Sequence, residues 1–488
     1  RIRGHQLGYR TTPNSYDAWD IEDYRRIQIG SDIMKLFDDT IIGISTALSK
    51  GAISIIRLSG DDAIKIVNKV FKGIDLSKVE PNTINYGHIV DFDSCQIIDE
   101  VLVSIFKAPK SYTKEDVVEI NCHGGLFVTN KIYEQLVLLG ARPSEPGEFT
   151  KRAFLSGRID LTKAEAVMDV INAENNAALK IANSALNGKI STFVDQKRQE
   201  LLDIIATISV NIDYPEYDDV EQLTNEDILP KLKTIKLELE DVLNNAKSAK
   251  LLKNGINTVI VGKPNVGKSS LLNTLIGENK AIVTNIPGTT RDIVEASINL
   301  GQVTLNLIDT AGIRITEDVV EKIGVEKSKE QINKADIILC VLDGSEPINE
   351  QDKEILNEIK NKCHLTIINK IDLEQKINLG EVDDNVLFIS TKNNNTIKEL
   401  ENKILETLNL NNLFNKDITY ISNARQLEKI NFAIKALDEA LTTIENEATI
   451  DFVDIDIRKA WLYLGEIVGQ TSTDNLLDEL FSKFCLGK

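Results

Sequence analysis

Residues 262–270, GKPNVGKSS, have the types and spacing of a phosphate-binding loop. They fit the pattern of Gly, four residues, Gly, Lys and Ser or Thr, between an apolar run at 258–261 and a helical pattern at 270–275. The glycines let backbone amides turn toward a phosphate. Lys268 would reach the β- and γ-phosphates, and the Ser269 hydroxyl would bind Mg²⁺. The other loop residues expected at the nucleotide are Asn265, Val266, Gly267 and Ser270.

Three further segments follow in the order that a nucleotide-binding domain requires. A strand at 305–308 ends in a DTAG motif, whose Asp309 can hold Mg²⁺ through water and whose Gly312 amide can meet a γ-phosphate. The apolar runs 337–342 and 365–368 are typical of buried parallel strands. Residues expected to bind the nucleotide in these segments are Asp309, Thr310, Ala311, Gly312, Asn369, Lys370, Asp372, Ser390, Thr391 and Lys392.

The base preference is carried by Asp372, in the motif Asn369-Lys370-Ile371-Asp372. Its carboxylate can accept hydrogen bonds from guanine N1–H and from the 2-amino group, a donor pair that adenine lacks. Residues 389–392 follow the last strand and would close over the base. The four segments together predict GTP, not ATP, as the bound nucleotide.

The catalytic groups differ from those of small regulatory GTPases, which place Gln after the DxxG glycine to orient water. Here that position is Ile313, so another polar residue must act, and Glu317, Asp318 and Glu321 are the candidates. Arg291 and Arg314 are the arginines available as a finger. Asn265 has two interpretations: its carbonyl oxygen holds a monovalent cation at the β–γ bridge, or it forms a loop-stabilising Asx turn.

The whole chain has a globular composition, with 488 residues, 42% hydrophobic and 27% charged. The length predicts about three domains, and no apolar run approaches a membrane span. A net charge of −19 excludes the broad positive field of a non-specific nucleic-acid binder, so RNA contacts are expected to be local or shared with a partner. Five scattered cysteines without a CxxC pair indicate reduced thiols in a cytoplasmic protein. The four histidines lack zinc spacing.

Changes between helical and strand patterns along the sequence indicate a multidomain α/β protein. A change from helical pattern to strands at Gly255, and back near residue 412, predicts a Ras-like α/β P-loop domain inserted in an all-α helical domain. The expected boundaries are a disordered extension at 1–33, an α+β domain at 34–157, helical segments at 158–253 and 413–488, and the inserted domain at 254–412. Met34 is expected to begin the folded protein.

The α+β domain is expected to mix short strands and helices. Strands are predicted at 53–58, 101–106 and 117–120, and helices at 61–72 and 127–139. The apolar residues at 41–44 are interrupted by Gly43 and predict no element on their own.

Several motifs together resemble one family. GKPNVGKSS, NIPGTTRD at 285–292, DTAGIR and NKID resemble the TrmE–Era–EngA–YihA group of GTPases. PGEFTKRAF at 146–154 and the terminal FCLGK at 484–488 resemble the MnmE (TrmE) family of tRNA modification GTPases. The resemblance runs from about Met34 to Lys488 and implies that 34–157 is a tetrahydrofolate-binding and dimerisation domain.

The resemblance implies the following cofactors and partners. It implies a GTP hydrolase, stimulated by K⁺, that works with an MnmG-type FAD flavoprotein to add a carboxymethylaminomethyl or aminomethyl group at C5 of the wobble uridine of certain tRNAs. The one-carbon donor would be 5-formyl-tetrahydrofolate or a related folate. A homodimer would join two flavoprotein subunits in a heterotetramer, without a membrane.

The resemblance also implies site residues at the matching positions of this chain. The implied potassium ligands are Asn265, Thr284, Ile286 and Thr289; the magnesium ligands are Ser269 and Thr290; the catalytic acid is Glu321; and the folate-binding residues are Arg57, Glu119, Arg158 and Lys488. Without the family, surface ion pairs are the preferred interpretation of the last four. With it, Glu119 suits a pterin and the cations suit a glutamate tail.

Cys485 has three interpretations. Its place four from the end fits a prenylation box, but Gly487 and Lys488 are poor final residues for one. A buried structural thiol is the second, and a role in the modification chemistry, implied by the family, is the third. Leu486 stands where CIGK endings have Ile, a volume-conserving change.

Two other functions remain open on the residues alone. An Era- or EngA-like ribosome-assembly GTPase should carry a KH module or a second G domain, and the sequence has neither pattern. A GTP-dependent scaffold with negligible turnover is the other, because Ile313 lacks the usual polar group.

Overall fold

The computed structural model describes residues 39–213, 225–278, 294–308, 332–382, 384–390, 396–410, 421–446, 449–470, 474–484 and 487. Its backbone contacts divide the chain into two compact units. The first holds the described residues up to Ile159 together with those from Asp474 onward, and the second holds the described residues between Asp160 and Thr473. Among the described helices, none is long and apolar enough to cross a membrane.

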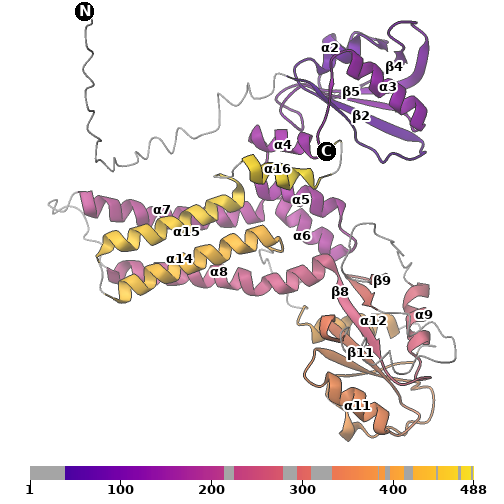
Figure 1. The fold of residues 1–488 in the computed structure, drawn as a ribbon, viewed down its shortest axis with the longest axis vertical. Helices are drawn as coiled ribbons and strands as arrows, with labels where there is room; N and C mark the ends of the chain where they lie inside the picture. Colours follow the sequence, from indigo (N-terminus) through magenta and orange to yellow (C-terminus); the bar gives the residue numbers. More distant parts are fainter. Residues whose placement is uncertain are drawn as a thin grey trace, which may run out of the picture. The chain divides into compact units, whose positions relative to one another are not determined.

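The first unit is built on a seven-stranded sheet in the order β3-β4-β5-β6-β2-β1-β7 (Figure 1). All neighbours are antiparallel except β1 and β7, which run parallel. The strands are β1 (Ile41–Ile44), β2 (Ile53–Ser59), β3 (Phe71–Lys72), β4 (Thr83–Val90), β5 (Ile97–Phe106), β6 (Val117–His123) and β7 (Arg142–Pro143).

Helices α2 (Ala63–Asn68) and α3 (Leu126–Leu138) contribute Ile66 and Ile132 to the core on one face of this sheet. Alternate strand residues such as Val103 and Ile120 point into that core, as the two-residue period of a strand requires. The intervening residues point to the other face. A short turn of 3₁₀ helix, η2 (Leu76–Lys78), follows β3.

The first unit also contains two helices that lie far apart in the sequence, α4 (Glu148–Leu155) and α16 (Asp474–Ser482). Phe481 of α16 is 2% exposed and contacts the rings of Phe154 and Phe484. Gly147 has φ 69°, and a Cβ there would lie 2.7 Å from the Phe481 carbonyl oxygen. Only glycine fits this close approach.

The second unit contains a helical bundle (α5–α8, α14 and α15). Its helices are α5 (Leu161–Ile171), α6 (Asn176–Leu186), α7 (Lys189–Asp213), α8 (Asn225–Asn254), α14 (Ala424–Glu445) and α15 (Ile450–Val468). In Figure 1, α7, α15, α14 and α8 lie side by side, and their apolar residues form one core. Leu201, Leu232, Leu437 and Leu464 are members of it, one from each long helix.

The same unit contains a six-stranded nucleotide-binding sheet in the order β13-β12-β11-β8-β10-β9. Its elements are β8 (Ile256–Val261), α9 (Lys268–Glu278), β9 (Val294–Leu300), β10 (Val303–Ile308), β11 (Ile337–Asp343), α11 (Glu350–Ile359), β12 (His364–Asn369), η3 (Leu379–Glu381), β13 (Val386–Phe388) and α12 (Thr396–Thr407). Only β9 and β10 pair antiparallel. Every residue of β11 is buried, which is why its sequence is continuously apolar.

The mixed α/β fold class predicted from the sequence is confirmed. The strands predicted at 53–58, 101–106 and 117–120 are present and extend further, and α3 lies within one residue of its prediction. The helix predicted at 61–72 is shorter, because Phe71 and Lys72 pair with β4. The sequence did not predict β1 and β4. The predicted domain boundaries stay a prediction, and residues 1–33 and Met34 lie outside the described part.

Candidate functional site

The phosphate loop leaves β8 and ends at α9, as the motif requires. Gly262 and Gly267 have φ of 145° and 103°, where L side chains are strained. A Cβ would lie 2.3 Å from the Val341 carbonyl oxygen at the first position and 2.1 Å from Asn369 Nδ2 at the second. Both glycines are therefore needed for the path of the loop.

Lys268 at the start of α9 points into its own loop. Its Nζ donates hydrogen bonds to the carbonyl oxygens of Gly262, at 2.5 Å, and Lys263, at 2.7 Å. Burial lowers the pKa of Lys268, because the charged ammonium is desolvated. A phosphate would restore a counter-charge, so this lysine is positioned for an anionic ligand.

Asn265 adopts the left-handed conformation, with φ 65°. Its side chain is exposed and makes no hydrogen bond to other described residues, so the described loop contains no Asx turn at this position. A free amide oxygen on the phosphate loop is compatible with a cation ligand. The other expected potassium ligands, Thr284, Ile286 and Thr289, lie outside the described residues.

The base-recognition motif begins at the end of β12. Asn369 is buried and donates from Nδ2 to the Val266 carbonyl oxygen at 3.0 Å, so it joins this motif to the phosphate loop. The Ser390 hydroxyl donates to Asp372 at 3.0 Å and orients the carboxylate that would bind guanine. The expected residues Lys268, Asn369, Asp372 and Ser390 thus lie along one edge of the sheet, at the carboxyl ends of its strands.

Two acidic residues near this edge were not predicted. Lys370 Nζ forms a 2.5 Å ion pair with Asp343 at the end of β11. Burial tends to raise the pKa of Asp343, but hydrogen bonds from Lys370 and Ser345 outweigh it and hold the pKa below its usual value. Lys263 pairs with the buried Asp352 of α11 at 3.2 Å. The sequence signal for Asp343 was present, since it ends an apolar strand as Asn369 does.

Many expected residues of the nucleotide site lie outside the described part of the chain. They are Asp309, Thr310, Ala311, Gly312, Ile313, Glu317, Asp318, Glu321, Thr290, Arg291, Arg314, Thr391 and Lys392. Their roles stay predictions, as do those of Val266, Ser269 and Ser270.

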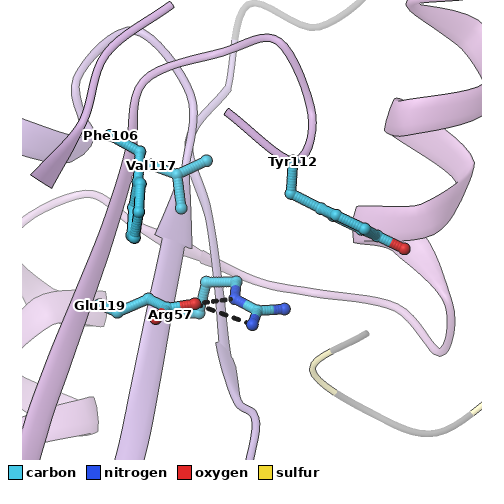
Figure 2. A pocket seen from close by; sticks show the side chains of 5 residues that line it. All are labelled: Arg57, Phe106, Tyr112, Val117 and Glu119. Atoms are coloured by element: carbon cyan, nitrogen blue, oxygen red, sulfur yellow. Dashed lines mark hydrogen bonds and ion pairs between the residues drawn. The ribbon is translucent and has the colours of Figure 1, made fainter. Parts of the chain in front are cut away.

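The first unit contains a separate cavity of about 370 Å³ on the sheet face opposite α2 and α3. Its lining residues are Arg57, Phe106, Tyr112, Val117 and Glu119 (Figure 2). Arg57 and Glu119 are directly paired across β2 and β6, so the fold itself brings these two predicted residues together. Phe106, Tyr112 and Val117 were not predicted as site residues.

The Arg57–Glu119 pair is asymmetric. Arg57 Nε and Nη2 both lie 2.8 Å from the same oxygen, Glu119 Oε1. Figure 2 shows both contacts converging on that atom. Glu119 Oε2 makes no hydrogen bond to the described residues and is available to accept hydrogen bonds from a ligand. The side chains are 21% and 22% exposed, so the pair is only partly screened by water.

Tyr112 of this cavity also contacts Arg158, the third predicted residue. The Arg158 guanidinium carbon lies 4.7 Å from the centre of the Tyr112 ring, and that of Arg57 lies 6.0 Å from it. The Tyr112 hydroxyl lies 3.0 Å from the Thr150 hydroxyl of α4. One cation, one carboxylate and an aromatic ring therefore line the cavity, and a second cation, Arg158, lies against that ring.

The loop that carries Tyr112 is held by a buried ion network. Arg152 of α4 is 1% exposed and bonds Glu115, Glu148 and Asp39, at 3.0, 3.1 and 2.6 Å. Arg142 bonds Glu148 at 2.5 Å. Glu148 and Arg152 belong to PGEFTKRAF, so this motif anchors the wall of the cavity and does not itself line it.

The C-terminal segment reaches the same cavity through Gly487. Its carbonyl oxygen accepts hydrogen bonds from Ser45 Oγ at 3.0 Å and from Arg57 Nη1 at 3.4 Å. A Cβ on Gly43 would lie 2.8 Å from Gly487 Cα, so two glycines allow the close approach. Lys488, which is predicted to bind folate, and Cys485 lie outside the described part.

Two family models match the chain. The model of the MnmE helical domain matches residues 161–485, and that of the GTP-binding protein TrmE N-terminus matches residues 40–158. Together they span both units.

Relatives with curated descriptions match over almost their whole length. The tRNA modification GTPase MnmE of Bacillus cytotoxicus is 50% identical over 455 residues, which are 92% of this chain and 99% of the relative. That of Bacillus mycoides is 49% identical with the same coverage. Among solved structures, the G domain of the T. maritima FeoB iron transporter is 29% identical and covers 31% of this chain and 98% of its own. Its TM-score of 0.24 is too low to bear on the fold of the whole chain.

Proposed function

The chain belongs to the MnmE family of tRNA modification GTPases, and from this premise we propose the details of its reaction. It is a GTP-hydrolysing enzyme of tRNA modification. We propose that it adds a carboxymethylaminomethyl or aminomethyl group at C5 of the wobble uridine, together with an MnmG-type FAD flavoprotein. A folate of the 5-formyl-tetrahydrofolate type is the proposed one-carbon donor.

The observation that carries this proposal is the cavity at Arg57 and Glu119. A pterin ring presents adjacent N–H donors, and Glu119 Oε2 offers an acceptor without a competing partner among the described residues. Phe106 and Tyr112 supply the apolar and aromatic walls of a planar-ligand site. The guanidinium groups of Arg57 and Arg158 provide the positive charge that suits a glutamate tail.

The C-terminal segment is proposed to complete this folate site. Gly487 already contacts Arg57. Lys488 directly follows Gly487 in the chain, and consecutive Cα atoms lie about 3.8 Å apart. We assign Lys488 to the folate carboxylates. Cys485 stays a candidate for the modification chemistry beside the alternative of a structural thiol.

For the nucleotide, Lys268 is proposed to bind the β- and γ-phosphates, and Asp372, oriented by Ser390, the guanine. Ser269 and Thr290 are the proposed magnesium ligands. Asn265, with Thr284, Ile286 and Thr289, would hold potassium, which supplies positive charge at the β–γ bridge in place of an arginine finger. Glu321 is proposed to orient the attacking water, because Ile313 cannot.

The proposed assembly is a homodimer joined through its first units, in a heterotetramer with the flavoprotein. Membership of the MnmE family favours this function over an Era- or EngA-like role in ribosome assembly. It also makes a scaffold with negligible turnover the weaker interpretation, since the family is one of GTPases. The cytoplasm is the proposed location.

The folate assignment is tested with Glu119→Gln. The change leaves the shape of the cavity but removes the carboxylate, so binding of 5-formyl-tetrahydrofolate should weaken about 10- to 100-fold. Isothermal titration calorimetry on the full chain gives the affinity. Glu134→Gln, on the exposed face of α3, is the matched control and should bind as the unaltered chain does. Equal affinity of all three proteins would refute the assignment.

A further inference from the structure

The hairpin of β9 and β10 is the element that links the nucleotide site to the rest of its unit. Strand β9 begins at Val294, directly after the segment with the proposed ligands Thr284–Thr290, and β10 ends at Ile308, directly before Asp309. The two strands pair from Leu300 and Val303 onward across a turn of two residues. One end of the hairpin therefore continues into both segments that would contact the γ-phosphate and its metal.

The turn end of this hairpin is bonded to the helical bundle. Asn175 caps α6, because its Oδ1 accepts a hydrogen bond from the Ala178 amide at 2.7 Å. Its Nδ2 donates to Thr304 Oγ1 of β10 at 3.0 Å and to the Leu252 carbonyl oxygen of α8 at 3.2 Å. Thr304 Oγ1 in turn donates to Asn299 Oδ1 of β9 at 2.7 Å. One side chain thus joins two helices to both strands.

This junction is buried. Asn175 and Thr304 are 9% and 2% exposed, and all the hydrogen-bonding atoms of the Asn175 side chain are used. Ala177 and Ile181 of α6 pack into the core of the nucleotide-binding sheet. The Ala177 amide also donates to the Gln302 carbonyl oxygen at 3.4 Å. Buried, fully satisfied polar contacts favour one arrangement over sliding, so a shift of the hairpin must move α6 or break these bonds.

We propose that Asn175 and Thr304 are positioning residues that transmit the nucleotide state from the hairpin to helices α6 and α8. Neither residue touches the nucleotide site described above, so they serve coupling and not hydrolysis. The proposal rests on the GTPase activity of the family and goes beyond the proposed folate and wobble-uridine chemistry. Coupling between sites in proteins is typically 5- to 150-fold, a range that a few buried hydrogen bonds can supply.

Two substitutions remove the junction while keeping its surroundings. Asn175→Ser retains a good helix cap but is too short to bridge to β10. Thr304→Val keeps the shape of the side chain and loses the hydroxyl. The matched control is Thr366→Val on β12, where the buried hydroxyl oxygen has no hydrogen-bond partner in the described structure. All three are compared with the unaltered full chain after checking that their Tm values are similar.

The main readout is amide hydrogen exchange in α6, with and without GDP and aluminium fluoride. In the unaltered chain and in Thr366→Val, we expect the nucleotide to change exchange across Asn176–Leu186. In Asn175→Ser and Thr304→Val, this change should shrink about fivefold or more, while GTP turnover stays within about twofold. The double variant should add nothing to either single one, because both remove the same contact.

Three results would overturn the proposal. One is no response of α6 to the nucleotide in the unaltered chain. Another is an undiminished response in both junction variants. The third is a loss of GTP turnover in step with the loss of the response, which would make these residues part of the hydrolytic scaffold. Failure of the proposed function is distinguishable, since the α6 response needs neither folate, flavoprotein nor tRNA.

Discussion

At the scale of single residues, carboxylates decide what the first unit can bind and how it is held. Glu119 has one oxygen available for a ligand, whereas both oxygens of Glu148 accept hydrogen bonds within the protein. Burial tends to raise the pKa of Glu148, but hydrogen bonds from Arg142 and Arg152 outweigh it and hold the pKa below its ordinary value. The same kind of group thus serves binding in one place and stability in another, according to its partners.

The network around Glu148 predicts a pH dependence of stability. Because the pKa of Glu148 is lowered on folding, its contribution is present above the unfolded pKa of about 4.3 and is lost as the pH falls below it. Glu148→Gln should therefore cost about 3 kcal/mol at pH 7, since it leaves Arg152 with one buried partner fewer. Thermal unfolding at pH 7, 4 and 2.5 measures this.

The contrast between the two proteins should shrink only below about pH 4.3, where the unfolded carboxylate takes up a proton, and should vanish as the pH falls through the lower native pKa. Glu134→Gln serves as the exposed control and should change little at any pH. A difference that stays constant from pH 7 down to pH 2.5 would contradict the assignment of charge to Glu148.

At the scale of elements, the phosphate loop depends on glycines where the chain passes other backbone. Gly267 faces Asn369, whose side chain ties the loop to the end of β12. The side-chain amide of Asn369 therefore holds the phosphate loop and the base-recognition motif together. Any side chain at 267 must displace that amide.

Gly267→Ala should weaken GTP binding about tenfold or more without unfolding the sheet, because alanine is strained at φ 103° and its Cβ meets Asn369 Nδ2. Titration with a fluorescent GTP analogue gives the affinity. Gly380→Ala, in an exposed segment with ordinary φ, is the comparison and should bind normally. Tight binding by the Gly267 variant would contradict the close approach.

At the scale of the whole molecule, two units with different chemistry belong to one chain. The second unit binds and hydrolyses GTP, and the first offers the proposed folate cavity. The proposed function assigns both to one task. The Asn175 junction is the proposed first step of that communication within the second unit.

The cation proposal is tested on the full chain. GTP turnover should be about tenfold or more faster in potassium than in sodium at equal ionic strength, because only a fitting ion supplies charge at the β–γ bridge. Asn265→Gly should abolish the difference, since glycine retains the left-handed backbone at φ 65° but lacks the ligand oxygen. Equal turnover in the two salts for the unaltered chain would reject the ion site.

Part of this architecture was predictable because its signals are local. Continuous apolar runs such as 337–342 indicate buried parallel strands. The loop at Gly262–Ser270 is recognisable from its motif alone. Strand β4 was not predicted, because its polar and apolar residues alternate over only four positions, 83–86, before Gly87 interrupts the pattern. Strand β1 was missed for the same kind of reason, as Gly43 interrupts its apolar residues.

The candidate sites were predictable where residues belong to recognisable motifs. Arg57 and Glu119, which pair across neighbouring strands, were predicted from the family resemblance. Tyr112 was not, because its place depends on a loop that Arg152 holds from a different element. Asn175 was not either, since a helix cap in the sequence says nothing about which strand it will meet. Long-range contacts of this kind arise from tertiary packing.

The contact between Arg57 and Gly487 spans 430 positions of the chain. A ribosome adds about 5 to 20 residues each second, so roughly 20 to 90 s separate the synthesis of the two residues. During that interval the nascent first unit lacks α16 and the Gly487 contact, and Gly43 and the Arg57 side chain stay open to other partners. This sequence should therefore place more demand on chaperones than its compact units suggest, and the bundle and nucleotide-binding sheet are made before the first unit can be completed.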